Sequence, residues 1–167
     1  AYMLNPLCLA LSPVALGIVF LYSYSKRFTW ATQLFLGVAL ALAPIGAWVA
    51  VTGRLDVEIL LLGGAVLMWV AGFDVIYSCQ DAEFDQQFGM YSIPQRFGVA
   101  TALMIARIFH LLAFVLMLGV GHVFGLGTIY FIGVFAVGGL LIYEHVLVRN
   151  QDLSKAGMAS LTMNGVV

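Results

Sequence analysis

The sequence predicts an all-α protein, a polytopic bundle of transmembrane helices. Of its 167 residues, 63% are hydrophobic and only 9% are charged, and the mean hydropathy is +1.05. Soluble domains carry about 25% charged residues, so this composition excludes an ordinary soluble protein and indicates a chain that lies in a lipid bilayer. The net charge of −1 and the few basic residues give no reason to expect a nucleic-acid partner.

Five complete apolar runs follow one another, and each has about the 20 residues that cross the hydrocarbon of a bilayer. The spans are expected at residues 7–24, 32–51, 57–77, 99–121 and 126–148, and the start of a sixth is expected near Met158. Pro6 opens the first span at a position where helices tolerate proline. Pro13 and Pro44 lie inside spans, where neighbouring helices can satisfy the freed carbonyl groups.

Alternating crossings place the loops on two sides of the membrane. One side receives five basic residues, Lys26, Arg27, Arg96, Arg149 and Lys155, and the other receives Arg54 alone. The positive-inside rule therefore makes the first side cytoplasmic, which in a bacterium would be the inner face of the cytoplasmic membrane. Cys8 and Cys79 are expected about a membrane thickness apart, too far for a disulfide.

The most polar stretch of the chain, residues 74–98, follows the third span on the predicted cytoplasmic side. Asp74, Asp81, Glu83 and Asp85 are half of the eight acidic residues. On one continuous helix, the spacing of positions 74, 77, 81 and 85 would place Asp74, Tyr77, Asp81 and Asp85 on one face. Glu83 would point elsewhere and is the weaker candidate ligand.

Asp81 and Asp85 are the predicted metal ligands. One helical turn separates them by roughly 6 Å along the axis, and two carboxylates so close repel each other unless a cation or a proton lies between them. Carboxylate oxygens suit Mg²⁺ better than zinc, and Mg²⁺ commonly bridges one or two carboxylates to phosphate oxygens. Tyr22, Ser23 and Lys26 share a helix face on the same side of the membrane, so a phosphate-bearing ligand is expected there.

Other polar side chains lie in or near the last two spans. Arg107 lies about two turns inside the fourth span with His110 on the same face, and the pair is either functional or a structural polar pair of the bundle. Glu144 and His145 are expected at the membrane interface. The apolar walls and the 12 Phe, 7 Tyr and 3 Trp residues would accommodate a long hydrocarbon and a carbocation. This chemistry fits the metal-assisted ionisation of a lipid diphosphate.

The pattern D-x-x-Y-x-x-Q-D-x-E-x-D-x-x-x-G-x-x-S-x-P-x-R-F-G, from Asp74 to Gly98, resembles the second aspartate-rich motif of the UbiA superfamily of intramembrane aromatic prenyltransferases. The stretches YSYSKR at residues 22–27 and LTMNGVV at residues 161–167 are similar to the same family. The resemblance covers nearly the whole chain, and it is closest to 4-hydroxybenzoate polyprenyltransferases and their relatives in quinone biosynthesis.

The resemblance implies about nine helices around a cavity that opens sideways to lipid, with two aspartate-rich motifs holding Mg²⁺ on a polyprenyl diphosphate. It implies that Asp81 and Asp85 hold the metal and that Asp74 is a further catalytic acid, which orients the aromatic acceptor or accepts the ring proton. The residues implied to bind substrate or diphosphate are Tyr22, Ser23, Lys26, Tyr77 and Arg96. The reaction implied is transfer of the polyprenyl group to 4-hydroxybenzoate in ubiquinone or menaquinone biosynthesis.

One part of the family pattern, the first motif N-D-x-x-D, is absent from these residues. We therefore expect residues 1–167 to form a partial domain, from about the fourth helix of the family to the start of the ninth, and to be inactive alone. Naphthoate, homogentisate or haem remains an alternative acceptor. A cation-coupled transporter or channel that uses the same carboxylates is the alternative from another class, and it predicts acids at mid-membrane depth.

Overall fold

The computed structural model describes residues 3–148 and is helical throughout the long apolar runs. The helices are α1 (Pro6–Ser25), α2 (Thr32–Thr52), α3 (Val57–Ser78), α4 (Ala82–Gln87), α5 (Ile93–Phe97), α6 (Val99–Val123) and α7 (Thr128–Leu147). Five of them, α1, α2, α3, α6 and α7, are long and apolar enough to cross a membrane. The five predicted complete spans are confirmed within two residues at every end, whereas the sixth lies outside the described residues.

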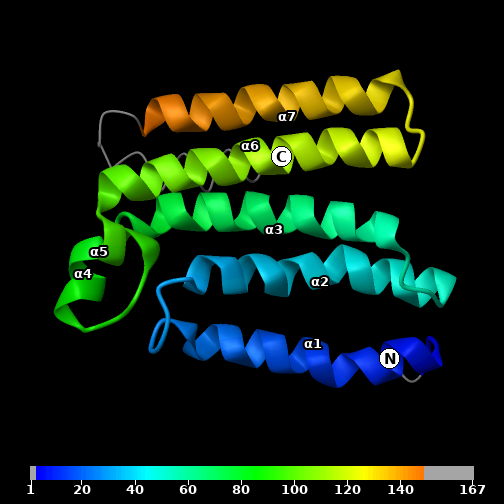
Figure 1. The fold of residues 1–167 in the computed structure, drawn as a ribbon, viewed down its shortest axis with the longest axis horizontal. Coiled ribbons are helices and arrows are strands. Elements are labelled where there is room, and N and C mark those ends of the chain that lie inside the picture. Colours follow the sequence, from blue (N-terminus) through cyan, green and yellow to red (C-terminus); the bar gives the residue numbers. More distant parts are fainter. Residues whose placement is uncertain (1–2, 149–167) are drawn as a thin grey trace.

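The five long helices lie side by side in one row in the order of the chain, and each runs antiparallel to the one before (Figure 1). α3 is the middle helix and packs most extensively against α2 and α6. The short helices α4 and α5 lie at the end of the row that also holds the α1–α2 loop (Figure 1). We call this end, with residues 26–31 and 79–98, the acidic end. Arg54 lies in the turn at the opposite end, as the alternation of crossings predicts.

Side chains near the helix ends determine where α1 and α2 begin and end. Asn5 caps α1 by accepting a hydrogen bond from the Cys8 N–H at 2.8 Å, and its amide donates to the Val49 carbonyl of α2 at 2.8 Å. Gly53 ends α2 in the left-handed conformation, with φ of 69°, which glycine adopts without a Cβ penalty. These contacts hold the first two helices together at the end opposite the acidic one.

The expectation of one continuous helix through residues 74–85 is wrong. α3 ends at Ser78, and α4 begins only at Ala82. Cys79 keeps a right-handed backbone, but the N–H groups of Cys79, Gln80 and Asp81 each bond to the carbonyl three residues earlier. This tighter turn redirects the chain before Asp81. Asp81 and Asp85 still lie one turn apart, because the Asp85 N–H bonds to the Asp81 carbonyl at 2.7 Å. Asp74 and Asp85 therefore do not share one helix face.

Pro94 lies in a short helix, α5, which begins one residue earlier at Ile93. Ser92 is extended and caps α5 by accepting a hydrogen bond from the Gln95 N–H at 3.3 Å, and Pro94 lies in the first turn. Proline is favoured there because the first N–H groups of a helix have no partner within it. Residues 79–98, which we call the acidic segment, thus connect α3 to α6 through two short helices.

The buried core lies behind the acidic end, where α3, α5, α6 and the end of α7 meet. Its centre includes Val75, Ile76, Ile93 and Ala106. Cys79 belongs to the same cluster, and burial raises the pKa of its thiol to about 12. Cys8 and Cys79 are both free, as expected, and a thiol that stays protonated at neutral pH is no nucleophile.

Glu144 lies three residues before the end of α7, at the span end where it was expected, but its side chain faces the protein interior. It is completely buried, and its Oε2 lies 3.6 Å from Nδ1 of His110 in α6. The same nitrogen of His110 lies 3.0 Å from Nε2 of His145. Burying a carboxylate costs free energy unless polar groups lie beside it, and His110 is such a neighbour for Glu144.

Candidate active site

A pocket of about 440 Å³ opens at the acidic end between α1, α2 and α3, and we call it the α1–α3 pocket. Its wall is formed by Tyr22, Ser23, Lys26, Arg27, Thr32, Asp74, Tyr77, Ser78, Asp81 and Met90. The wall includes six of the eight site residues predicted from the sequence. It also includes basic and acidic groups that come from segments far apart in the chain, which is the arrangement expected of a site for a charged ligand.

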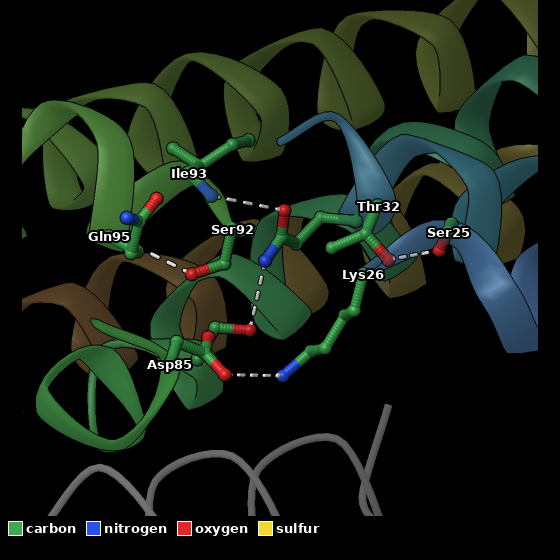
Figure 2. Close-up of polar contacts among 9 residues, drawn as sticks. Ser25, Lys26, Thr32, Asp85, Ser92, Ile93 and Gln95 are labelled. Atoms are coloured by element: carbon green, nitrogen blue, oxygen red, sulfur yellow. Dashed lines mark hydrogen bonds and ion pairs between the residues drawn. The ribbon is translucent and has the colours of Figure 1, made fainter. Parts of the chain in front are cut away.

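Asp85 lies behind this wall and is joined to it by Lys26. The Lys26 Nζ lies 3.4 Å from Asp85 Oδ1, and the Asp85 side chain is 1% exposed whereas that of Lys26 is 37% exposed. Figure 2 shows Lys26 extended from the end of α1 toward Asp85. A buried carboxylate is strongly stabilised by such a cation, because an isolated charge loses its hydration there. Lys26 therefore holds Asp85 and faces the pocket at once.

Arg96 is placed differently. It is exposed, its guanidinium carbon lies 5.6 Å from the centre of the Phe97 ring, and it is not part of the pocket wall. Its binding to diphosphate stays a prediction.

Gln33 is a residue of this region that sequence reasoning missed. It lies in the first turn of α2 and is completely buried. Its Nε2 donates to Ser78 Oγ at 3.0 Å, and its Oε1 accepts from the Ile93 N–H at 3.4 Å. One side chain thus connects the last residue of α3 to the first residue of α5, on either side of the segment that carries Asp81 and Asp85. A glutamine at the start of an otherwise apolar helix was the available signal.

A second set of contacts holds the acidic segment against the end of α1. The Tyr91 N–H donates to the Lys26 carbonyl at 2.8 Å, and the Met90 N–H donates to the Asp85 carbonyl at 2.8 Å. The hydroxyls of Ser25 and Thr32 are bonded to each other beside Lys26 (Figure 2). The segment is therefore fixed to the end of α1 by Tyr91 and to α2 by Gln33.

We expect Gln33→Leu in the full-length protein to weaken the ordering of the acidic segment. The change removes two hydrogen bonds and leaves buried polar groups unpaired, each at a cost of about 1–3 kcal/mol. The predicted Mg²⁺ site should then bind the ion about tenfold more weakly, on the scale of 1.4 kcal/mol per factor of ten. Titration of the full-length protein with Mg²⁺ tests this.

Gln95→Leu is the matched control for Gln33→Leu. Gln95 bonds Ser92 through its backbone N–H, and this hydrogen bond does not depend on the side chain that is replaced. An unchanged Mg²⁺ affinity of Gln33→Leu, or an equal change in both variants, would contradict the role of Gln33.

The acidic residues present fit a divalent metal ion with oxygen ligands. Asp85 Oδ2 is buried and has no hydrogen-bond partner among the described residues, and such an atom calls for an explanation. Asp81 lies on the pocket wall one turn away. In residues 3–148 no three His, Cys, Asp or Glu side chains are grouped to hold a metal. Two carboxylates nonetheless suit Mg²⁺, which takes its other ligands from water and phosphate.

Comparison with known proteins identifies the family. Residues 1–166 match the model of the "UbiA prenyltransferase family". The chain belongs to this family. The UbiA resemblance of the acidic motif is thereby confirmed, and it extends over almost all of the sequence.

Curated relatives include three proteins named 4-hydroxybenzoate octaprenyltransferase. The chain is 31% identical to that of Vibrio parahaemolyticus over 98% of its own length and 57% of the relative's. It is 33% identical to that of Saccharophagus degradans over 97% and 54%, and 35% identical to that of Alcanivorax borkumensis over 89% and 51%. The chain thus spans a little more than half the length of the UbiA relatives it matches.

A solved structure supports the fold. The chain is similar to the apo structure of a UbiA homolog from Aeropyrum pernix K1, with a TM-score of 0.87 and 30% identity. The match covers 97% of this chain and 62% of the homolog. The antiparallel row of helices and the acidic end therefore belong to the UbiA architecture, and the all-α transmembrane prediction is confirmed.

Proposed function

We propose that this chain is part of a Mg²⁺-dependent enzyme that transfers a polyprenyl group from polyprenyl diphosphate to an aromatic acceptor, 4-hydroxybenzoate, in the biosynthesis of ubiquinone or menaquinone. The observation that carries the proposal is the α1–α3 pocket, in which Lys26 meets Asp74 and Asp81 at one end of an apolar bundle. Membership of the UbiA family and relatives named 4-hydroxybenzoate octaprenyltransferase support it.

The pocket residues would bind the diphosphate end of the donor. The ammonium of Lys26 attracts the diphosphate oxygens, and the hydroxyls of Tyr22 and Ser23 lie on the same wall to donate hydrogen bonds. The remaining tail is hydrocarbon and stays in the apolar interior. Binding the charged end at the acidic end of the bundle places the first prenyl carbon just inside the membrane.

Asp81 and Asp85 would hold the Mg²⁺ ion, and a charge of +2 there neutralises the departing diphosphate. Lys26 holds Asp85 in place, because their side chains form an ion pair. The C–O bond to diphosphate breaks, the acceptor ring forms a C–C bond ortho to its hydroxyl, and the ring proton leaves. Asp74 lies on the same wall and is the proposed group that orients the acceptor or accepts this proton.

The 167 residues are proposed to be a partial UbiA domain, because the relatives extend well beyond the matched part. The first aspartate-rich motif would come from the rest of the domain, and residues 1–167 alone would be inactive. Naphthoate, homogentisate and haem are the alternative acceptors.

The five apolar helices make this an integral membrane protein. We propose that the acidic end faces the cytoplasm, because the described basic residues there, Lys26, Arg27 and Arg96, outnumber Arg54 at the opposite end. Asp81 and Asp85 follow the third span and lie outside it, which does not favour a transporter with acids at mid-membrane depth.

The test is prenyl transfer by the full-length protein in membranes. Labelled polyprenyl diphosphate and 4-hydroxybenzoate should give a prenylated product with Mg²⁺, and excess EDTA should remove the activity. Parallel reactions with the three alternative acceptors would identify a different aromatic substrate. No product with any acceptor, from protein that is correctly inserted, would refute the proposal.

A further inference from the structure

A larger cavity lies between α6 and α7 and is separate from the α1–α3 pocket. It has a volume of about 830 Å³, and we call it the α6–α7 groove. Most of its wall is apolar and includes Leu111, Phe114, Phe135 and Ile142. The polar side chains on the wall are Arg107, His110 and His145. An apolar cavity of this size with a few convergent polar groups is typical of a ligand site.

The polar and apolar parts of the groove are separated by depth in the membrane. α6 begins at the acidic end, so Arg107 lies about 12 Å along the helix and Phe114 about 22 Å along it, at 1.5 Å per residue. α7 ends there, so His145 lies about 3 Å from the end and Phe135 about 18 Å from it. The groove therefore runs along the bilayer normal, with its polar part nearer the membrane surface and its apolar part near the middle.

The charge at the polar part of the groove is positive. Arg107 is exposed, and the ion pairs found in residues 3–148 do not include it. Helical side chains lean toward the N-terminus of their helix, which for α6 is the acidic end, so the guanidinium extends toward the headgroup level. Glu144 is completely buried, its Oε2 lies 3.6 Å from Nδ1 of His110, and it does not line the groove. A cation within the bilayer needs an anionic partner or water.

We propose that the α6–α7 groove binds an anionic phospholipid of the leaflet at the acidic end, with the lipid phosphate at Arg107 and an acyl chain along the apolar wall. His145 is half-buried beside Arg107 and is held by its 3.0 Å contact with His110, so it offers a positioned hydrogen-bonding group to the head. The planar guanidinium group of an arginine can donate two parallel hydrogen bonds to phosphate oxygens.

Two adjacent glycines of α7 shape the apolar part of the groove. A Cβ at Gly138 would lie 2.8 Å from the Phe114 ring, so this glycine lets the two helices approach. A Cβ at Gly139 would meet nothing within 4 Å, so this position opens onto free space, and it lies on the groove wall. A large side chain at position 139 would fill the room that the acyl chain needs without disturbing the packing at Gly138.

The experiment is native mass spectrometry of the full-length protein, titrated in detergent with phosphatidylglycerol or with phosphatidylcholine. One retained phosphatidylglycerol is expected, in about fivefold preference to phosphatidylcholine. Arg107→Gln should remove this preference, and Gly139→Leu should reduce the retention of both lipids. Arg96→Gln is the matched control, since Arg96 is an exposed arginine at the same end but lies outside the groove.

Equal retention of the two lipids by the unchanged protein would overturn the proposal. Lipid retention that neither Arg107→Gln nor Gly139→Leu alters would also overturn it. An absence of bound lipid, because another part of the full-length protein covers the groove, would overturn it as well. Thermal denaturation of each variant, with helicity followed by circular dichroism, separates loss of lipid from loss of fold. The outcome does not depend on prenyl transfer, because the α1–α3 pocket shares no wall residue with the groove.

Discussion

Asp81→Asn in the full-length protein is expected to abolish prenyl transfer while the protein remains inserted in the membrane. Asp81 lies on the wall of the α1–α3 pocket, where its carboxylate is proposed to hold Mg²⁺. Asparagine keeps the size of the side chain but loses the charge that attracts the ion. The rate should fall at least about 100-fold, the scale on which loss of one charge-stabilising group slows an enzyme. The measurement is product formation at several Mg²⁺ concentrations.

Glu83→Gln provides the control for Asp81→Asn. Glu83 lies in α4, two residues after Asp81, but it is exposed and is not part of the pocket wall. Its replacement changes the net charge of the segment equally and should leave transfer within about twofold, as expected for a surface charge screened by salt. Normal activity of Asp81→Asn would refute the metal role of this residue, and equal losses in both variants would point to a general charge effect.

The positions of the spans could be predicted from the sequence because they depend on local properties. The run from residue 57 to 77 is apolar except for Glu58 and Asp74 near its ends, and a helix is the structure that satisfies its backbone in lipid. The structure extends this helix by only one residue, to Ser78. Gly53 and Pro6 mark helix ends through their own backbone preferences, which need no knowledge of the rest of the fold.

The contacts around the pocket could not be predicted because they join residues far apart in the chain. Lys26 and Asp85 are 59 positions apart, and Gln33 and Ile93 are 60 apart. The regular spacing of acids suggested one helix face through Asp85, but the turn after Ser78 sends Asp85 behind the pocket wall. The burial of Glu144 could not be predicted either, because its neighbour His110 lies in another helix.

Gly72→Ala is expected to destabilise the bundle more than its single added methyl group suggests. Gly72 lies in α3, two residues before Asp74, and a Cβ there would lie 2.2 Å from Cδ2 of His110 in α6. His110 has little room to move, because it is 3% exposed and hydrogen-bonded to His145. Forcing extra atoms into a packed interior costs about 1–3 kcal/mol. The free energy of unfolding, measured by SDS titration from mixed micelles, should fall by this amount.

Gly119→Ala in α6 is the matched control, because a Cβ at that glycine meets nothing within 4 Å. It should be neutral or slightly stabilising, as alanine favours a helix over glycine by about 1 kcal/mol. Combining Gly72→Ala with His110→Ala should cost less than the two single changes added together, by at least about 1 kcal/mol, because removing the imidazole makes room for the methyl group. Strict additivity would show that His110 does not clash with the new methyl group and that α3 yields in another way.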